Sequence, residues 1–435
     1  MSNPDVIIVG GGIGGLAAAF ALSREGLQVR LLERAPEFGE VGAGLQIAPN
    51  CTRILDEYGL LEEVKSLGVL PDDMIMFDGV DPSTGSGTSR GTELTRLDLR
   101  DLEQRYGFPY MVIHRSDLHA TFLRACQRAG VELINGATAV DYESNTAADD
   151  GPRATVILED GSRHTAPVVI AAEGIHSPAR YKFAGDDPVS SSYVAYRGAI
   201  PIESARENNI HEKAVVLYLG NNCHFVQYGL RGGEMFNQVA VFESPKALAG
   251  EEDWGTPDEL DAAFADTVGD VQDALKFMWR DRWWRMYDRE SIPNWIFGRV
   301  ALLGDSAHAP LQYIAQGAIM AIEDGWVLAK HVARNSSTNS ETGGRTIDWD
   351  AALSAYNAVR TQHTARVLAT SRQWGILWHH VGEKREQRNA ILSARDVHDY
   401  SFVDWLYGPT ALFPEDEAEM FEAIPLDSVE LPARV

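Results

Sequence analysis

The sequence is poor in cysteine and in positive charge. Its 3 cysteines, Cys51, Cys126 and Cys223, are too few and too widely spaced for a disulfide framework or a zinc ribbon, and they indicate reduced thiols in a cytoplasmic protein. The 38 Lys and Arg residues face 63 Asp and Glu, which gives a formal net charge of −25. A field this acidic repels phosphates and anionic lipids, so the sequence predicts no nucleic-acid partner.

Long apolar runs are also missing. No stretch reaches the roughly 18 residues that a transmembrane helix needs, and the first residues lead into a strand-like segment instead of a signal peptide, so we expect no membrane insertion. The sequence also has no cluster of His, Cys and carboxylate residues that would suggest a metal site. The remaining composition is that of an ordinary globular protein, with 45% apolar and 23% charged residues in 435 positions, enough for two packed domains.

A glycine-rich turn near the start is the first motif that indicates chemistry. It reads Gly10-Gly-Gly-Ile-Gly-Gly15 and lies between a short β-branched strand and an Ala-rich helix. Gly10, Gly12 and Gly15 fit the pattern G-x-G-x-x-G, whose glycines let backbone N–H groups approach a pyrophosphate at the helix N-terminus. Glu33 ends the following strand, where a carboxylate suits ribose hydroxyls and disfavours a 2′-phosphate. The motif predicts a dinucleotide site, and by itself it does not separate NAD from FAD.

Two later segments also follow buried strands. In residues 304–310, Gly-Asp-Ser-Ala-His-Ala-Pro, Asp305 comes directly after the strand, at the edge where α/β sheets bind ligands. Its carboxylate can accept hydrogen bonds from a ribityl chain, or it can cap a helix. Gly317 and Ala318 then open a helix whose N-terminus can stabilise negative charge on a reduced flavin. Residues 173–180, Glu-Gly-Ile-His-Ser-Pro-Ala-Arg, indicate little on their own.

Residues 190–245 follow a different pattern, because short alternating strands succeed one another without helices. This predicts an antiparallel sheet inserted into the parallel one, and residues 257–278 are predicted to be helical. The predicted fold class is therefore α/β, with a Rossmann-like nucleotide-binding domain, an inserted antiparallel β-sheet domain and C-terminal helices.

Taken together, the three motifs resemble those of the single-component FAD-dependent aromatic hydroxylases, which include salicylate, 4-hydroxybenzoate and 3-hydroxybenzoate hydroxylases. The resemblance is closest to the 3-hydroxybenzoate 6-hydroxylases and runs through nearly the whole chain. The similar stretches lie at residues 40–46, 114–121, 223–228, 231–235 and 310–313.

The resemblance implies a division of the chain and a role for individual residues. The FAD-binding domain would comprise residues 1–72, 100–181 and 292–375, the substrate domain 73–99 and 182–291, and a C-terminal helical and irregular segment 376–435. The residues implied to bind FAD are Gly10, Gly12, Ile13, Gly15, Glu33, Arg34, Gln46, Arg115, Val140, Asp305, Gly317 and Ala318. The residues implied to lie over the substrate ring are His224, Tyr228 and Gln312.

The residues themselves agree with part of this. Because side chains alternate along a strand, His224 and Tyr228 share one face of the strand 223–230, with their Cα atoms roughly 13 Å apart. We therefore assign His224 to the phenol, as a general base near its ordinary pKa of about 6.5, and Tyr228 to the carboxylate end of an aromatic acid. Gln312 would hold the phenolic oxygen.

The expected reaction is hydroxylation of 3-hydroxybenzoate to gentisate by FAD, NADH and oxygen. Decarboxylative hydroxylation of salicylate to catechol is the nearest alternative, and a dinucleotide-dependent dehydrogenase or a flavin-binding regulator without turnover are the others. Three departures from the family pattern bear on this: Glu173 stands where Asp is usual, Gln316 replaces a small residue beside the flavin, and Gly229 replaces a common Pro. Relatives of this type are often dimers, so the resemblance also implies a homodimer.

Overall fold

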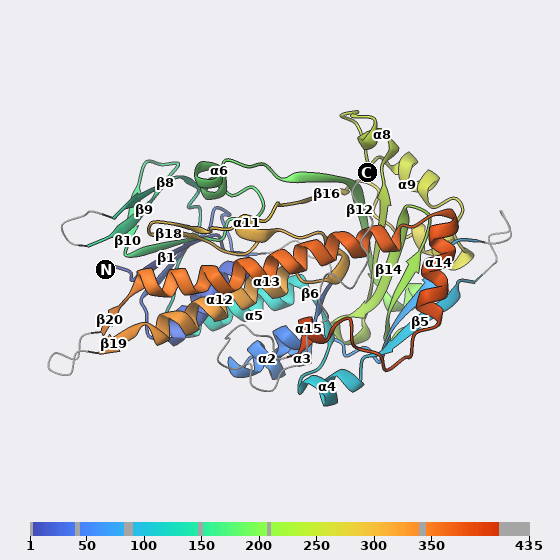
Figure 1. Cartoon of the computed structure of the whole chain (residues 1–435), viewed down its shortest axis with the longest axis horizontal. Coiled ribbons are helices and arrows are strands. Elements are labelled where there is room, and N and C mark those ends of the chain that lie inside the picture. The colour runs from blue at the N-terminus through green and yellow to red at the C-terminus, as the bar shows by residue number, and fades with distance from the viewer. Residues whose placement is uncertain are drawn as a thin grey trace. The chain divides into compact units, whose positions relative to one another are not determined.

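The computed structural model describes residues 3–39, 44–81, 90–146, 151–206, 210–338 and 345–408. The chain forms two compact units, which are described separately (Figure 1). The first comprises Met1–Val41, Arg115–Val189 and Tyr287–Thr370, and the second Gly42–His114, Ser190–Met286 and Ser371–Val435. Residues 42–72 and 100–114, expected in the nucleotide-binding domain, thus belong to the second unit. One reason is that β3 (Gly44–Ile47) pairs with β6 (Met111–His114).

The first unit is built on a six-stranded sheet. Its strand order is β17 (Ile296–Phe297), β18 (Val300–Leu302), β11 (Val168–Ala171), β1 (Val6–Val9), β2 (Val29–Leu32) and β7 (Glu132–Ile134). All neighbours pair in parallel except β17 and β18. The β1 strand is buried along its whole length, as its uninterrupted β-branched sequence predicts. The Rossmann-like part of the expected fold is confirmed.

Helices and a smaller sheet complete this unit. Helix α1 (Ile13–Arg24) packs against α5 (Arg115–Arg128) and α12 (Gly317–Arg334). The other elements are β8 (Ala139–Asn145), β9 (Arg153–Leu158), β10 (Arg163–Ala166), α6 (Pro178–Ala184), α11 (Asp305–His308), η2 (Gln312–Ile314), β19 (Ser336–Thr338) and β20 (Arg345–Ile347). Helix α13 (Trp349–Trp378) begins in this unit, and its last residues belong to the second.

The second unit is built on a seven-stranded sheet. Its order is β16 (Trp284–Asp288), β12 (Val189–Pro201), β15 (Met235–Glu243), β14 (Cys223–Leu230), β13 (Ala214–Leu219), β4 (Asp73–Asp78) and β5 (Thr92–Asp98). Strands β12 to β13 pair antiparallel, as expected, but β4 joins β13 in parallel. The antiparallel pairing predicted for residues 190–245 is confirmed, and the parallel pairing lies outside that range, because β4 comes from residues 73–78.

An apolar core covers one face of this sheet. Residues of β12, β13, β14 and β15 pack there against α9 (Pro257–Ala263) and α10 (Gly269–Leu275). The single helix predicted for 257–278 is thus two, separated by a turn in which Phe264 and Val268 point into the core. Helix α14 (Gly382–Ser393), drawn in red, lies beside β5 (Figure 1). The remaining elements are α2 (Pro49–Glu57), α3 (Leu61–Leu67), α4 (Asp101–Tyr106), α7 (Ile202–Arg206), η1 (Arg231–Gly233), α8 (Pro245–Leu248) and α15 (Asp404–Tyr407).

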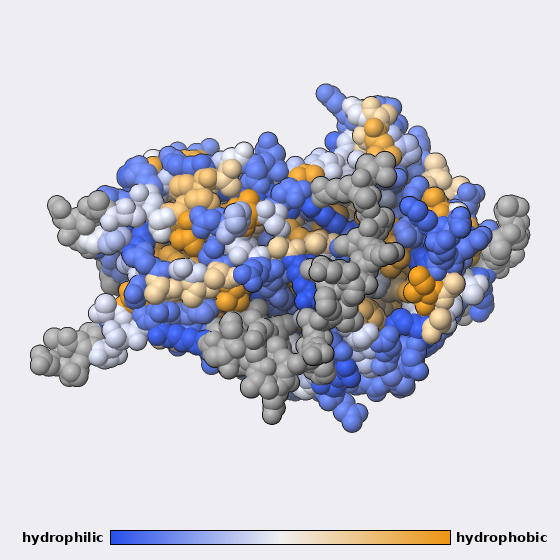
Figure 2. Space-filling model, in the orientation of Figure 1, coloured by the Kyte–Doolittle hydropathy of each residue, from blue (hydrophilic) through white to orange (hydrophobic). Residues whose placement is uncertain are grey.

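The surface is largely polar. Figure 2 shows a mostly hydrophilic face with scattered apolar residues. Within the described ranges, no helix has both the length and the apolar composition to span a bilayer.

The contact between α1 and α12 depends on a glycine and gives a prediction. A Cβ at Gly325 would lie 2.7 Å from Ala18 Cα and 2.8 Å from its nitrogen, closer than backbone atoms tolerate. Helix propensity alone favours Gly325→Ala by about 1 kcal/mol, whereas overpacking costs about 1–3 kcal/mol. We expect the substitution to lower the urea unfolding midpoint. A raised midpoint would show that α1 and α12 can move apart at so little cost that the gain in helix propensity exceeds the cost of overpacking.

Candidate active site

In the first unit, the turn between β1 and α1 leaves no space for side chains. A Cβ at Gly10 would overlap the carbonyl of Ala172, and one at Gly15 would overlap the carbonyl of Gly10. Gly10 also has a φ of +108°, in the left-handed region that favours glycine. The N-cap of α1 is Gly12, which has no side chain to cap the first N–H groups of the helix. The turn is therefore a backbone cradle at a helix N-terminus, which suits a pyrophosphate.

The Gly11 peptide in this turn is held from both sides. Its N–H donates to Glu33 Oε2 at 2.5 Å, and Glu33 Oε1 accepts the Ala35 N–H at 2.8 Å. On the other side, Nε2 of the buried His119 donates to the Gly11 carbonyl at 2.8 Å. Glu33 thus lies against the glycine turn. His119 lies within the family-like stretch 114–121, but the sequence analysis gave it no role, because a single His inside a helix has no chemistry that its sequence neighbours reveal.

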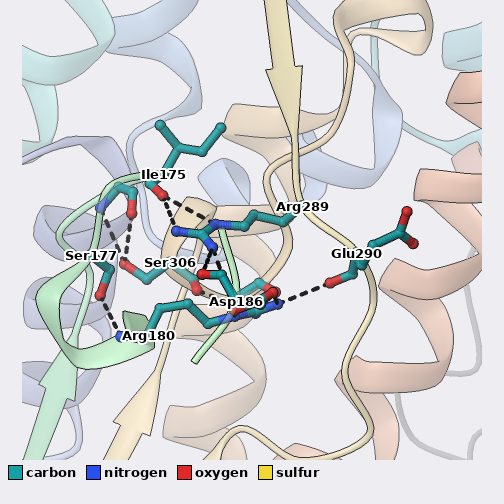
Figure 3. Close-up of polar contacts among 9 residues, drawn as sticks. Ile175, Ser177, Arg180, Asp186, Arg289, Glu290 and Ser306 are labelled. Carbon is teal, nitrogen blue, oxygen red and sulfur yellow. Dashed lines mark hydrogen bonds and ion pairs between the residues drawn. The ribbon is translucent and has the colours of Figure 1, made fainter. Parts of the chain in front are cut away.

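The segment 173–180, uninformative in the sequence, anchors a buried network (Figure 3). The Arg180 guanidinium makes two hydrogen bonds of 2.6 Å to Asp186 and donates to the Ala307 carbonyl at 2.8 Å. Arg289 donates to the Ile175 carbonyl at 2.6 Å, and the Gly174 N–H donates to Ser306 Oγ at 3.1 Å.

The network has an electrostatic and a structural consequence. Burial opposes the charge of Asp186, but its bonds to Arg180 and the charge of Arg289 outweigh burial and lower the pKa of Asp186. Because Arg180 is fully buried, this pair holds the segment 304–308, which contains α11, against the loop that follows β11.

Asp305 is the first residue of α11 and is exposed, while both of its neighbours are buried. The segment 304–308 is also held from α12: Asp324 Oδ2 accepts the Gly304 N–H at 2.8 Å and pairs with His308 Nε2 at 2.6 Å. Asp324 Oδ1 accepts a 2.7 Å hydrogen bond from Arg360, and both side chains are fully buried. Burial opposes the charge of Asp324, but His308 and Arg360 lower its pKa. A buried charge network therefore presents the Asp305 carboxylate to solvent.

The start of α12 also has an unusual backbone. Ala315 has a φ of +53°, a conformation that residues with a Cβ rarely adopt. Gly317 and Ala318 are the first residues of α12, whose N-cap, Gln316, makes no side-chain cap hydrogen bond. Such strained turns before an uncapped helix are common at ligand sites.

Glu173, which stands where Asp is usual in the family, has a structural role. Its carboxylate accepts hydrogen bonds from the Tyr142 hydroxyl, from Ser177 Oγ at 2.5 Å and from the Ala179 N–H at 3.3 Å. Burial raises the pKa of Glu173, and these hydrogen bonds oppose the rise. The side chain therefore holds the N-terminal turn of α6.

Four other predicted residues lie at separate places. Arg34 is exposed after β2, Arg115 begins α5, Val140 on β8 is 50% exposed, and Gln312 begins η2. Gln46 lies on β3 in the second unit, where its Oε1 accepts a 2.5 Å hydrogen bond from the Tyr110 hydroxyl.

In the second unit, β14 has two chemically different faces. Cys223 and Phe225 point into the apolar core. His224, Val226 and Tyr228 occupy the opposite face, as their alternation predicts. The Tyr228 ring lies where a Cβ at Gly44 would be, so any other residue at position 44 would displace the ring.

His224 is paired with a second buried imidazole. Its Nδ1 lies 2.8 Å from Nε2 of His379, which stacks on Tyr193 at 4.6 Å, and the Trp378 ring contacts His224 edge-on. Burial lowers the pKa of His224 to about 3, so the value near 6.5 assumed from the sequence was wrong. The imidazole is neutral at physiological pH. His379 escaped the sequence analysis because 155 residues separate it from His224.

The structure thus places His224 and Tyr228 together on β14, and it gathers the glycine turn with Glu33 in the first unit. Gln312 belongs to the first unit, so its grouping with His224 and Tyr228 stays a prediction.

Comparisons with known proteins agree with these observations. Residues 3–371 match the FAD binding domain family. The chain is 36% identical over 409 residues to the 3-hydroxybenzoate 6-hydroxylase of Polaromonas naphthalenivorans (strain CJ2), covering 93% of this chain and 95% of that protein. It is 32% identical to the 3-amino-4-hydroxybenzoate 2-monooxygenase PtnB3 of Streptomyces platensis, over 98% of both chains.

A solved structure shares the fold. Klebsiella pneumoniae HpxO, complexed with FAD and uric acid, superposes with a TM-score of 0.75 at 24% identity, covering 90% of this chain and 92% of that one.

The chain belongs to the FAD-binding domain family, within the single-component FAD-dependent aromatic hydroxylases. The cofactor fits the first unit, because its glycine turn leaves a cradle that Cβ atoms would fill and because the exposed Asp305 and the N-terminus of α12 suit ligand hydroxyls and negative charge.

The Arg180 network gives a prediction about stability and cofactor retention. Arg180→Met removes the principal partner of Asp186, whose side chain is 29% exposed, together with the donor to the Ala307 carbonyl, which costs about 2 kcal/mol. We expect a matching drop in the free energy of unfolding and weaker FAD retention on gel filtration. The control is Arg163→Met, which breaks an exposed pair with Glu143 and costs at most about 1 kcal/mol. Equal effects of both substitutions would contradict the buried network.

The buried His224 gives a prediction about acid stability. Because its folded pKa of about 3 lies below the ordinary 6.5, the unfolded chain binds a proton there that the folded chain excludes. Stability at His224 is therefore lost as the pH falls below about 6.5, by about 1.4 kcal/mol per pH unit. In urea unfolding between pH 7.5 and 4.5, His224→Gln should show a shallower loss than the wild type. His176→Gln, at an exposed position, should match the wild type; if His224→Gln does so too, His224 is not buried neutral.

Proposed function

We propose that the protein hydroxylates a small phenolic aromatic acid, with 3-hydroxybenzoate as substrate and gentisate as product. The balanced reaction takes 3-hydroxybenzoate, O2, NADH and a proton to gentisate, NAD+ and water. When bound, FAD takes the electrons from the nicotinamide and transfers one oxygen atom to the ring. The 36% identity to a 3-hydroxybenzoate 6-hydroxylase supports this substrate.

The observation that carries the proposal is the pattern of side chains along one face of β14. His224 and Tyr228 are polar ends, 1% and 3% exposed, and Val226 lies between them. An aromatic acid has the same sequence of groups: a phenolic oxygen, an apolar ring and a carboxylate. The burial of all three side chains would also exclude water from the ring, which limits wasteful side reactions.

His224 would act as the general base of the reaction. Its Nδ1 lies 2.8 Å from His379 Nε2, and the imidazole would accept the phenolic proton. Removing that proton raises the electron density of the ring at the positions ortho and para to the oxygen, including the position hydroxylated in gentisate. Although burial makes free His224 a weak base, a phenolate beside it favours the imidazolium. Gln312 would hydrogen-bond the same oxygen.

The other predicted residues would hold the cofactor. We propose the backbone of Gly10, Gly12, Ile13 and Gly15 for the pyrophosphate, with Glu33 and Arg34 at the adenosine ribose. Asp305, Gly317 and Ala318 would complete the flavin site, Gln46 and Arg115 would contact the ribityl–diphosphate region, and the backbone near Val140 would contact the adenine.

The test is oxygen uptake with NADH across a panel of hydroxybenzoates, with products identified by chromatography. We expect 3-hydroxybenzoate to stimulate uptake and to yield gentisate. His224→Ala should retain FAD and consume NADH, but its yield of hydroxylated product should fall by about 100-fold, because general-base catalysis is lost. The control is His176→Ala, at an exposed position, which should behave as the wild type.

The outcomes separate the alternatives. Catechol from salicylate would identify decarboxylative hydroxylation instead, and a yellow protein whose NADH oxidation no aromatic acid accelerates would be a flavin-binding regulator. Normal product yield from His224→Ala would remove His224 from the mechanism.

A further inference from the structure

The polar end of β14 that contains Tyr228 continues onto the neighbouring strand. In the antiparallel register, Tyr228 faces Asn237 of β15, Val226 faces Val239, and His224 faces Val241. Directly opposite residues lie on the same side of a sheet. The two strands therefore present a floor with an apolar middle, Val226 and Val239, and two polar ends of different chemistry.

Asn237 is oriented by a hydrogen bond that uses only half of its amide. Its Oδ1 accepts the Gly44 N–H at 3.1 Å, so its Nδ2 must point elsewhere. Asn237 is 1% exposed, yet its Nδ2 has no hydrogen-bond partner among the residues that the structure describes. Leaving a buried N–H donor without an acceptor costs free energy, so this donor needs an explanation, and a ligand that accepts its hydrogen bond is one.

Positive charge lies on the same face. Arg197 of β12 faces Val239, and its guanidinium lies 5.3 Å from the centre of the Trp284 ring. Its charge reaches the neighbouring phenol: burial raises the pKa of Tyr228, and Arg197 opposes the rise. In a protein with a net charge of −25, a cation on this face of the sheet makes the face more favourable for an anion.

We propose that Asn237 determines specificity for the acid: its Nδ2 donates a hydrogen bond to the substrate carboxylate, beside Tyr228 and within the field of Arg197. This rests on the proposed function, and it adds a recognition residue that no motif marked. The Gly44, Tyr228 and Asn237 contacts form the carboxylate end of the floor, opposite His224.

The test is a binding titration of the oxidised holoenzyme, followed by the flavin absorbance, with 3-hydroxybenzoate and with uncharged 3-hydroxybenzyl alcohol. Asn237→Asp keeps the oxygen that accepts the Gly44 N–H and replaces the NH2 group by a second carboxylate oxygen. We expect its Kd for the acid to rise about tenfold or more, because a donor to a charged group becomes a like charge. Its Kd for the alcohol should stay within about twofold of the wild type.

A second substitution and a control complete the experiment. Asn237→Ala, which adds no charge, should raise the Kd for the acid by a smaller factor and again leave the Kd for the alcohol nearly unchanged. The control Asn222→Asp makes the same charge change at an exposed position before β14 and should leave both Kd values unchanged.

Each result is decisive. Unchanged acid binding in both Asn237 variants, or equal weakening of acid and alcohol, would overturn the carboxylate contact while leaving the proposed function intact. A wild-type protein that binds neither compound would overturn the proposed function and the contact together.

Discussion

The buried carboxylate of Asp324 is the constraint on which the nucleotide-binding unit depends. An isolated charge in a protein interior is unstable, so it must be satisfied on every side. Arg360, His308 and the Gly304 N–H supply those contacts, so helix α13 and the segment 304–308 are both tied to α12. These contacts fix the segment 304–308, in which Asp305 is the exposed residue. Arg180 holds the same segment from the other side through the Ala307 carbonyl.

The second unit uses the two faces of one sheet for two purposes. One face packs an apolar core against α9 and α10 and supplies stability. The opposite face carries buried polar groups at intervals along β14 and β15, namely His224, Tyr228 and Asn237. Polar groups this well buried contribute little net stability, so their presence is better explained by a ligand of matching chemistry.

Much of this was accessible from the sequence, for reasons that differ between sites. The glycine turn and Glu33 could be predicted because close backbone approach restricts the residue type wherever it occurs, and the shared face of His224 and Tyr228 follows from strand periodicity. Their environment could not be predicted. Burial lowers the pKa of His224 to about 3, and the neighbours that pack against it, Trp378 and His379, come from the far end of the chain.

The nucleotide-binding turn, the α/β class with its inserted sheet and the resemblance to the aromatic hydroxylases could therefore be predicted, because each depends on the local spacing of residue types. Three features became visible only in the folded chain: β4 joins β13 in parallel, Arg180 holds the segment 304–308, and Asn237 lies opposite Tyr228 with an unused donor. Those features depend on which distant segments meet, and burial, register and charge satisfaction settle that only when the whole chain has packed.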